Sequence, residues 1–279
     1  MMSFRPLRVS FLLVAALASG GVPSSTFQPP GLPFGPGERL VYNVSWSVFP
    51  AGQVTAAVTK EAGKNGRDAL QILTTAHSRG FVSLIYNLND QFRSIVDSKS
   101  LCSQEISKQI NEGRRHKQTR IVFDSTRRVA ILDERDLTKP HDPPKHTENA
   151  IPACVEDIVT GFYYLRRQPM HVGGQIHVPV NDGSKTHDVI AEVEAREQID
   201  TALGKRFAFR VEPRVFGDLY KKKGRMLIWF SDDAQRLPLR IKAELLVGDI
   251  VGNLQSVATP GSIEAAPGSS PPVSGGNPG

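Results

Sequence analysis

The chain has 279 residues, with 39% hydrophobic and 22% charged residues and a formal net charge of +6. The positive charges gather in short clusters, residues 114–117 and 221–223, and not in one broad stripe with stacking aromatics, which argues against a nucleic-acid partner. We interpret both clusters as solvated hairpin ends, with an anionic lipid or polymer as the less favoured explanation.

The first 20 residues predict a secretory signal peptide. Arg5 and Arg8 precede an apolar run over residues 9–17, and small residues near Ala18 suit cleavage. The run is shorter than the roughly 20 residues that span a bilayer, so a retained membrane anchor is the less favoured alternative. We therefore expect a periplasmic or secreted protein, with no transmembrane segment after the signal is removed.

Composition then divides the remaining chain into three parts. Residues 21–36 and 256–279 are rich in Pro, Gly and Ser, and are expected to be a flexible linker and a disordered tail. Residues 37–255 are long enough for one domain with a sizeable core.

Most of this domain alternates hydrophobic and polar residues, as half-buried strands do. The strand at residues 38–47 places Leu40, Tyr42, Val44 and Trp46 on one face. Residues 226–231 are apolar on both faces, which predicts a central strand packed on both sides. The expected strands are residues 38–47, 53–60, 69–77, 91–96, 104–110, 119–123, 128–132, 175–180, 185–195, 207–212, 226–231 and 239–247.

About eleven or twelve strands exceed what a flat sheet tolerates, so the sheet should curl or close. We expect a mainly β fold, an open or closed antiparallel barrel, with one main amphipathic helix over residues 155–166 packed on or in it. A short helix is also expected at residues 81–86. The long helix is indicated by Val155, Val159, Phe162 and Leu165 at helical spacing.

The two cysteines are Cys102 and Cys154, the latter just ahead of the expected helix. A helix N-terminus can activate a thiol, but Glu156 and Asp157 disfavour a thiolate there. Two cysteines in an exported protein most simply form a disulfide. Cys154 therefore gives no reason to expect an enzyme.

Three segments together resemble a known family. They are Gly37-Glu38-Arg39-Leu40-Val41-Tyr42 with Trp46 and Gly52, Phe162-Tyr163-Tyr164-Leu165-Arg166, and Trp229-Phe230-Ser231-Asp232-Asp233 with Leu237-Pro238. In order and spacing they resemble an exported bacterial family known as domain of unknown function 3108, over residues 37–254. The resemblance implies a β-rich, barrel-like domain and no established activity, so no catalytic residue follows from it.

Catalytic motifs are missing from the sequence: there is no G-x-S-x-G, H-E-x-x-H, phosphate-binding glycine loop or C-x-x-C. His171, His177 and His187 come nearest to a metal cluster. A two-residue turn at Asp182-Gly183 would pair Val178 with His187 and turn His177 to the other face, although a one-residue longer loop would reverse this. We therefore predict no metal site and no cofactor. Asp232 and Asp233 are expected to open a turn and not to act as a carboxylate pair.

Five aromatic residues are the candidates for lining a ligand cavity: Tyr42, Trp46, Tyr163, Tyr164 and Trp229. Such rings line apolar pockets as well as fill cores, and a packed core is the simpler explanation. Our leading hypothesis is an envelope protein that binds or carries a lipid or other amphiphilic ligand in the barrel, without catalysis. The alternatives are an interaction or scaffold protein with a filled barrel, and a hydrolase acting on envelope substrates.

Overall fold

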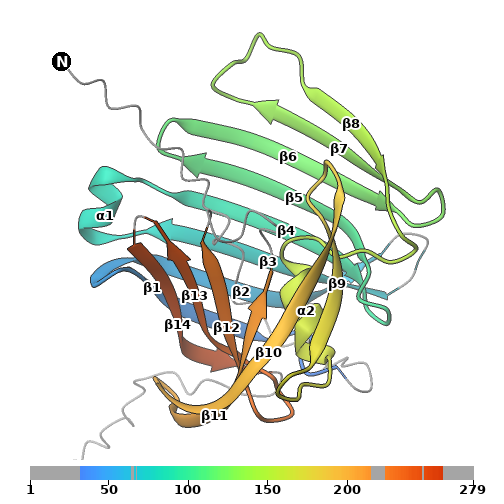
Figure 1. Ribbon diagram of the computed structural model, residues 1–279. Coiled ribbons are helices and arrows are strands. Elements are labelled where there is room, and N and C mark those ends of the chain that lie inside the picture. The colour runs from blue at the N-terminus through green and yellow to red at the C-terminus, as the bar shows by residue number, and fades with distance from the viewer. Residues whose placement is uncertain (1–31, 64–65, 67, 215–223, 247, 260–279) are drawn as a thin grey trace, which may run out of the picture.

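The computed structural model describes residues 32–63, 66, 68–214, 224–246 and 248–259. The expected signal peptide, most of the expected linker and tail, and the basic cluster at residues 221–223 lie outside this part of the chain. Within it, fourteen strands form one sheet in the order β8-β7-β6-β5-β4-β3-β2-β1-β14-β13-β12-β11-β10-β9 (Figure 1). Every neighbouring pair is antiparallel.

The first half of the sheet consists of consecutive hairpins. Its strands are β1 (Arg39–Trp46), β2 (Phe49–Ala62), β3 (Asp68–Ser78), β4 (Asn89–Asp97), β5 (Ser103–Glu112), β6 (Arg115–Asp124), β7 (Val129–Asp136) and β8 (Lys145–Ala150). The second half returns to β1 through β9 (Gln175–Asn181), β10 (Thr186–Thr201), β11 (Gly204–Pro213), β12 (Arg225–Ser231), β13 (Pro238–Leu245) and β14 (Gly248–Ala258). The described residues also form two helices, α1 (Gly80–Ile85) and α2 (Thr160–Arg167).

The sheet curls so that its two halves face each other with α2 between them (Figure 1). Its edges are β8 and β9, and no strand ladder joins these edges in the described chain. The expected mainly β, curled antiparallel sheet is confirmed, and of the two alternatives the sheet is open. Two of its strands, β8 and β14, were not among those expected.

The inner face of the sheet carries most of the core. Leu40 and Tyr42 of β1 are buried on this face, in agreement with the predicted alternation. Leu32 and Phe34, which precede the expected start of the domain, are buried in the same core. The prediction that residues 226–231 are packed on both sides is also confirmed, because every residue of β12 after Arg225 is buried.

The predicted helix over residues 155–166 is wrong at its start, because α2 begins only at Thr160. Residues 154–159, which we call the strap, bind other strands instead. Ser103 N of β5 donates to Val155 O at 2.9 Å, Glu156 N donates to Pro179 O of β9 at 2.8 Å, and Asn181 N donates to Glu156 O at 2.8 Å. The strap thus occupies backbone positions on β9 that a further strand would otherwise use.

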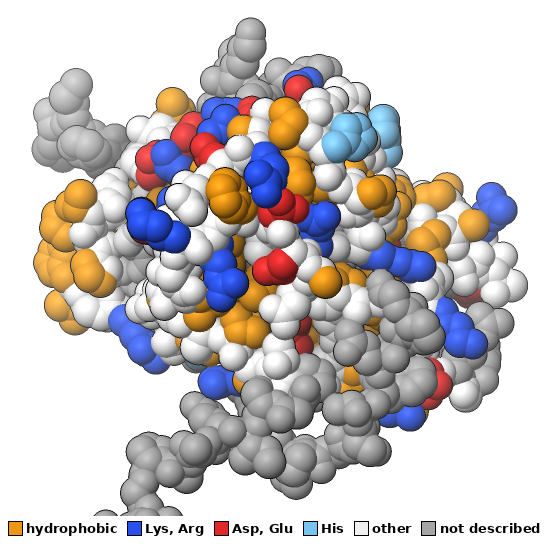
Figure 2. Space-filling view, turned by 90° about the horizontal axis from the view of Figure 1, so that it is seen from below, with side chains coloured by type: hydrophobic (Ala, Val, Ile, Leu, Met, Phe, Trp, Pro, Cys, Tyr) orange, Lys and Arg blue, Asp and Glu red, His pale blue; other side chains and the backbone are white. Residues whose placement is uncertain are grey.

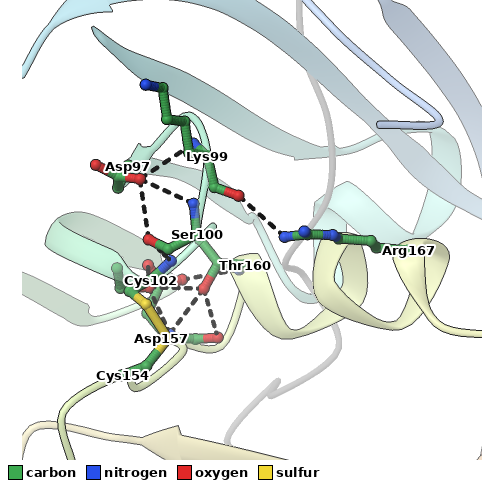
Figure 3. Close-up of a disulfide and its surroundings, with 9 residues drawn as sticks. Asp97, Lys99, Ser100, Cys102, Cys154, Asp157, Thr160 and Arg167 are labelled. Carbon is green, nitrogen blue, oxygen red and sulfur yellow. Dashed lines mark hydrogen bonds between the residues drawn. A yellow bond between two sulfur atoms is a disulfide. The ribbon is translucent and has the colours of Figure 1, made fainter. Parts of the chain in front are cut away.

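A disulfide fixes one end of the strap, as predicted (Figure 3). Cys154 is bonded to Cys102, which lies just before β5, and their Cα atoms are 5.1 Å apart. No free cysteine is found. The thiol interpretation of Cys154 is therefore excluded.

Asp157 fixes the other end of the strap to two strands and to α2. Its side chain accepts hydrogen bonds from Ser94 Oγ and Ser103 Oγ, both at 3.0 Å. It also accepts from the backbone N–H groups of Val159 at 2.7 Å and Thr160 at 3.0 Å, which satisfies donors at the start of the helix. The same carboxylate therefore positions β4, β5 and α2.

Glu156, the neighbour of Asp157, is buried without such bonds. Both of its carboxyl oxygens lack a hydrogen-bond partner among the described residues. Burial raises the pKa of Glu156 well above its usual range, and the adjacent Asp157 raises it further. The folded protein therefore favours the protonated form of Glu156.

The edges β8 and β9 meet through side chains, not through a ladder. Asn181 Nδ2 donates to Asn149 Oδ1 at 2.7 Å, and Asn149 Nδ2 donates to Gly183 O at 3.0 Å. Gly183 has a φ of +98°, and a Cβ atom there would lie 2.3 Å from Leu132 Cδ1. Only glycine therefore fits the turn that approaches β7.

The disulfide should contribute strongly to stability. Replacing both Cys102 and Cys154 with serine is expected to lower the free energy of unfolding by about 4 kcal/mol, because the bond closes a loop with a sequence separation of 52 residues. Urea denaturation of both proteins measures the difference. Reduced wild type should unfold at the same midpoint as the double variant, and a loss below about 1 kcal/mol would contradict the assigned role.

The buried Glu156 should make stability fall as pH rises. Because its folded pKa lies above its unfolded pKa, the folded state holds a proton that the unfolded state has lost once the pH exceeds about 4.5. Glu156→Gln removes this titration, so its melting temperature should exceed that of wild type at pH 8 and converge with it near pH 4. Thermal denaturation across this range is the measurement. Glu148→Gln, at a side chain that is 42% exposed, is the control; parallel curves for Glu156→Gln and wild type would refute the assignment.

Candidate functional site

Lys108 lies on the inner face of β5 within a largely apolar wall. Its cross-strand neighbours are Phe92 on β4 and Thr119 on β6. Ile106 and Ile110 flank it on the same face of the strand, and both are buried. Along β5 and towards β4 its neighbours are therefore hydrocarbon, whereas Thr119 and the ion pair of Lys117 with Glu134 lie on the side of β6 and β7.

Lys108 makes no hydrogen bond or ion pair with any described residue, although three carboxylates lie close enough to favour its charge. These carboxylates have other partners. Asp157 accepts hydrogen bonds from Ser94 and Ser103. Asp182 accepts from the N–H groups of Ser184 and Lys185 at 2.7 and 3.0 Å. Glu134 accepts from Lys117 at 2.6 Å and from Thr119 at 3.2 Å. The Lys108 ammonium group therefore keeps hydrogen-bonding capacity that no described residue uses.

Burial lowers the pKa of Lys108, and the neighbouring carboxylates oppose this shift only in part. An anion bound at the ammonium group would favour the charged form and reverse the effect. The site therefore suits a ligand that brings its own negative charge into an apolar setting.

A second polar cluster lies on the same face, where β4, β5 and β6 approach α1. Asp90 accepts from Asn111 N at 2.7 Å, while Glu112 accepts from Arg115 at 2.9 Å and from the Tyr86 hydroxyl at 3.2 Å. Burial, together with the nearby Glu112, raises the pKa of Asp90 to about 7. Asp90 therefore gains or loses its proton near neutral pH.

Two of the five aromatic candidates meet in the core. Tyr42 and Tyr163 lie beside a buried ion pair, in which Arg166 Nη1 and Nη2 donate to the Glu38 carboxylate at 2.7 and 2.8 Å. The guanidinium also lies 5.2 Å from the Tyr163 ring centroid, and the Tyr42 hydroxyl donates to Pro238 O at 2.6 Å. Because all four side chains are almost fully buried, this part of the interior is filled by the protein itself.

The other three aromatic candidates lie apart. Trp46 is 36% exposed at the end of β1, and Tyr164 is partly buried on α2. Trp229 faces outwards from β12, opposite to its neighbour Phe230, and donates from Nε1 to Glu197 at 2.6 Å. That the five residues line one ligand cavity stays a prediction.

One pocket among the described residues has a volume of about 240 Å³. It lies beside the β12–β13 turn and is lined by residues that include Arg206, Asp233, Leu237 and Leu239. None of the five aromatic candidates lines this pocket.

The pairing of β9 with β10 differs from the prediction, but the faces on which His177 and His187 lie do not. His187 pairs with Val180, and Val178 pairs with Val189, because residues 182–185 form a loop two residues longer than expected. The shift of two residues keeps His177 and His187 on opposite faces. No group of three His, Cys, Asp or Glu side chains in the described chain is placed to hold a metal ion.

The two adjacent aspartates form a turn, as expected. Asp233 accepts from the N–H groups of Gln235 at 3.0 Å and Arg236 at 3.2 Å. Asp232 pairs instead with Arg196 at 2.6 Å. The carboxylates of Asp232 and Asp233 therefore contact different partners.

Sequence reasoning missed Lys108, the residue on which the site depends. The pattern Ile106-Lys108-Ile110 places a lysine at an inward position of an otherwise apolar strand face. This lysine between two inward-facing isoleucines was the signal in the sequence that could have pointed to the site. It could not show that the nearby carboxylates, which come from β7, the strap and the β9–β10 loop, would all have other partners.

The fold is similar to that of a solved structure. A β-barrel-like protein of domain of unknown function DUF1849 from Brucella abortus has a TM-score of 0.53 at 7% sequence identity, covering 81% of this chain and 98% of its own. A Bacteroides fragilis protein, described as exported and with a YmcC-like fold, has a TM-score of 0.34 at 9% identity, covering 81% and 97% of the two chains. Neither helix among the described residues is long and apolar enough to cross a membrane.

No curated protein matches the sequence significantly. The family model for proteins of unknown function DUF3108 does match it, over residues 41–255. The matched region includes the strands on both sides of the curled sheet, the strap and Lys108. The chain therefore belongs to the DUF3108 family of proteins of unknown function.

Proposed function

We propose that this protein is exported and binds an acidic amphiphile of the cell envelope on the inner face of its curled sheet. The ligand class is a molecule with a carboxylate or phosphate head and a hydrocarbon tail. Lys108 binds the acidic head, and the apolar residues around it contact the tail. The protein acts as a binding or carrier protein and not as a catalyst.

The observation that carries this proposal is the partnerless ammonium group of Lys108 in an apolar wall. Lys108 is half-buried, and a lysine that loses contact with water without gaining a partner destabilises a fold. Charge-assisted hydrogen bonds from an acidic ligand would offset that cost.

Export is supported separately. A structural disulfide is typical of an oxidising compartment outside the cytoplasm. The apolar run near the N-terminus, which predicts a signal peptide, is consistent with the same location.

The proposal predicts a head-group-specific loss of binding. Lys108→Met keeps the length and apolar character of the side chain but removes its charge. Calorimetric titration with dodecanoate should show an affinity at least tenfold lower than that of wild type, since hydrogen bonds to charged groups contribute about 1.5–3 kcal/mol. Titration with dodecanol, which has the same chain and no charge, should give equal affinities for the two proteins.

The matched control is Lys205→Met, because this side chain is 68% exposed and lies on a hairpin. It should bind dodecanoate as wild type does. Equal dodecanoate affinities for wild type and Lys108→Met would refute the proposed role of Lys108. The absence of any amphiphile in organic extracts of protein purified from its native host would count against the function as a whole.

A further inference from the structure

One end of the molecule exposes large apolar side chains from three segments. They come from the β1–β2 turn, from α1 and from the β13–β14 turn. We call this surface the apolar end; it consists of Trp46, Val48, Phe49, Phe81, Leu84, Ile85 and Leu246. Figure 2 shows hydrophobic side chains gathered at the side of the molecule on which Figure 1 places α1.

Hydrogen bonds hold the three segments next to one another. Ser47 N in the β1–β2 turn donates to Asp249 O at 2.6 Å, which ties that turn to the start of β14. Arg79 N, just before α1, donates to Ala51 O of β2 at 2.8 Å. The apolar end is therefore one continuous part of the fold.

Its most exposed side chains project from the tips of these segments. Val48, Leu84 and Leu246 are 84%, 83% and 86% exposed, which is far more than the packing of the domain requires. A protein partner would need a separate matching pocket for each projecting side chain. The fluid interfacial layer of a membrane receives such side chains without a preformed pocket.

Charged residues of both signs lie around the apolar end, and the basic ones gather beside α1. Arg79 immediately precedes α1, and the described residues of the three segments themselves carry no charge. Gly113 N donates to Asn87 O at 2.7 Å, which places the exposed Arg114 and Arg115 beside α1. The exposed acids nearest to the β13–β14 turn, Glu244 and Asp249, both pair with Lys242, at 2.9 and 2.8 Å.

We propose that the apolar end docks on a lipid bilayer that contains anionic lipids. The projecting hydrophobic side chains enter the interfacial layer, and Arg79 and Arg114 bind the negatively charged head groups. Aromatic rings such as those of Trp46 and Phe49 suit this boundary, where one side is apolar and the other is wet. This inference rests on the outer surface and does not depend on ligand binding at Lys108.

Vesicle flotation of the exported protein tests the proposal. Wild type should float with vesicles of phosphatidylglycerol and phosphatidylcholine, and bind vesicles of phosphatidylcholine alone more weakly. The variant Val48→Ser with Leu84→Ser should partition about tenfold less, because two exposed apolar side chains no longer enter the bilayer. The variant Arg79→Glu with Arg114→Glu should lose the preference for anionic vesicles, by about fivefold for each basic residue removed.

The matched control is Val172→Ser with Phe207→Ser, at side chains 54% and 49% exposed in the α2–β9 loop and on β11. It should float like wild type, and circular dichroism should show that all variants are folded. Unchanged flotation of the Val48 and Leu84 variant would overturn the proposal. So would a dimer in analytical ultracentrifugation that this variant abolishes while wild type binds no vesicles, because a second copy would then be the partner.

Discussion

The hydrogen bonds of the Asp157 carboxylate are the interaction on which the rest of this fold depends. A large antiparallel sheet curls through its own twist, but its two free edges are not fixed relative to each other by any strand ladder. Asp157 joins β4, β5 and the first turn of α2, and the backbone of the same strap binds β9 from the opposite side of the sheet. The disulfide between Cys102 and Cys154 limits how far this segment can move. Together these bonds set the distance between the two halves of the sheet.

The space between the two halves of the sheet contains two different regions, one around Arg166 and one around Lys108. Around Arg166, the ion pair with Glu38 and the rings of Phe34 and Tyr163 fill the space, and removing either charged partner of such a pair generally costs about 3–5 kcal/mol. Lys108 forms no such ion pair, because the three nearby carboxylates accept hydrogen bonds from other residues. The first region is therefore filled by the protein's own paired side chains, whereas the second combines an unmet hydrogen-bonding capacity with apolar neighbours.

The sequence predicted the part of the fold that follows from local alternation. Leu40, Tyr42 and the β12 residues lie where their spacing places them. It did not predict β14, in which Gly248 and Gly252 interrupt the pattern, or β8, whose residues are mostly exposed at the edge. The start of α2 was misplaced because Val155 lies at helical spacing from Val159, whereas in the structure Val155 binds β5 and Glu156 binds β9. A tertiary constraint therefore overrides a local preference. Lys108 was missed for the same reason, because its significance depends on contacts between distant strands.

The junction between β8 and β9 differs in kind from every other boundary in the sheet. Neighbouring strands elsewhere are joined by backbone ladders, whereas Asn149 contributes two side-chain hydrogen bonds where these two edges meet. Separating them would leave every ladder intact, while separating any other pair would break a whole row of backbone bonds. The wall of the molecule therefore has a seam between β8 and β9, the boundary that opens at the loss of the fewest hydrogen bonds.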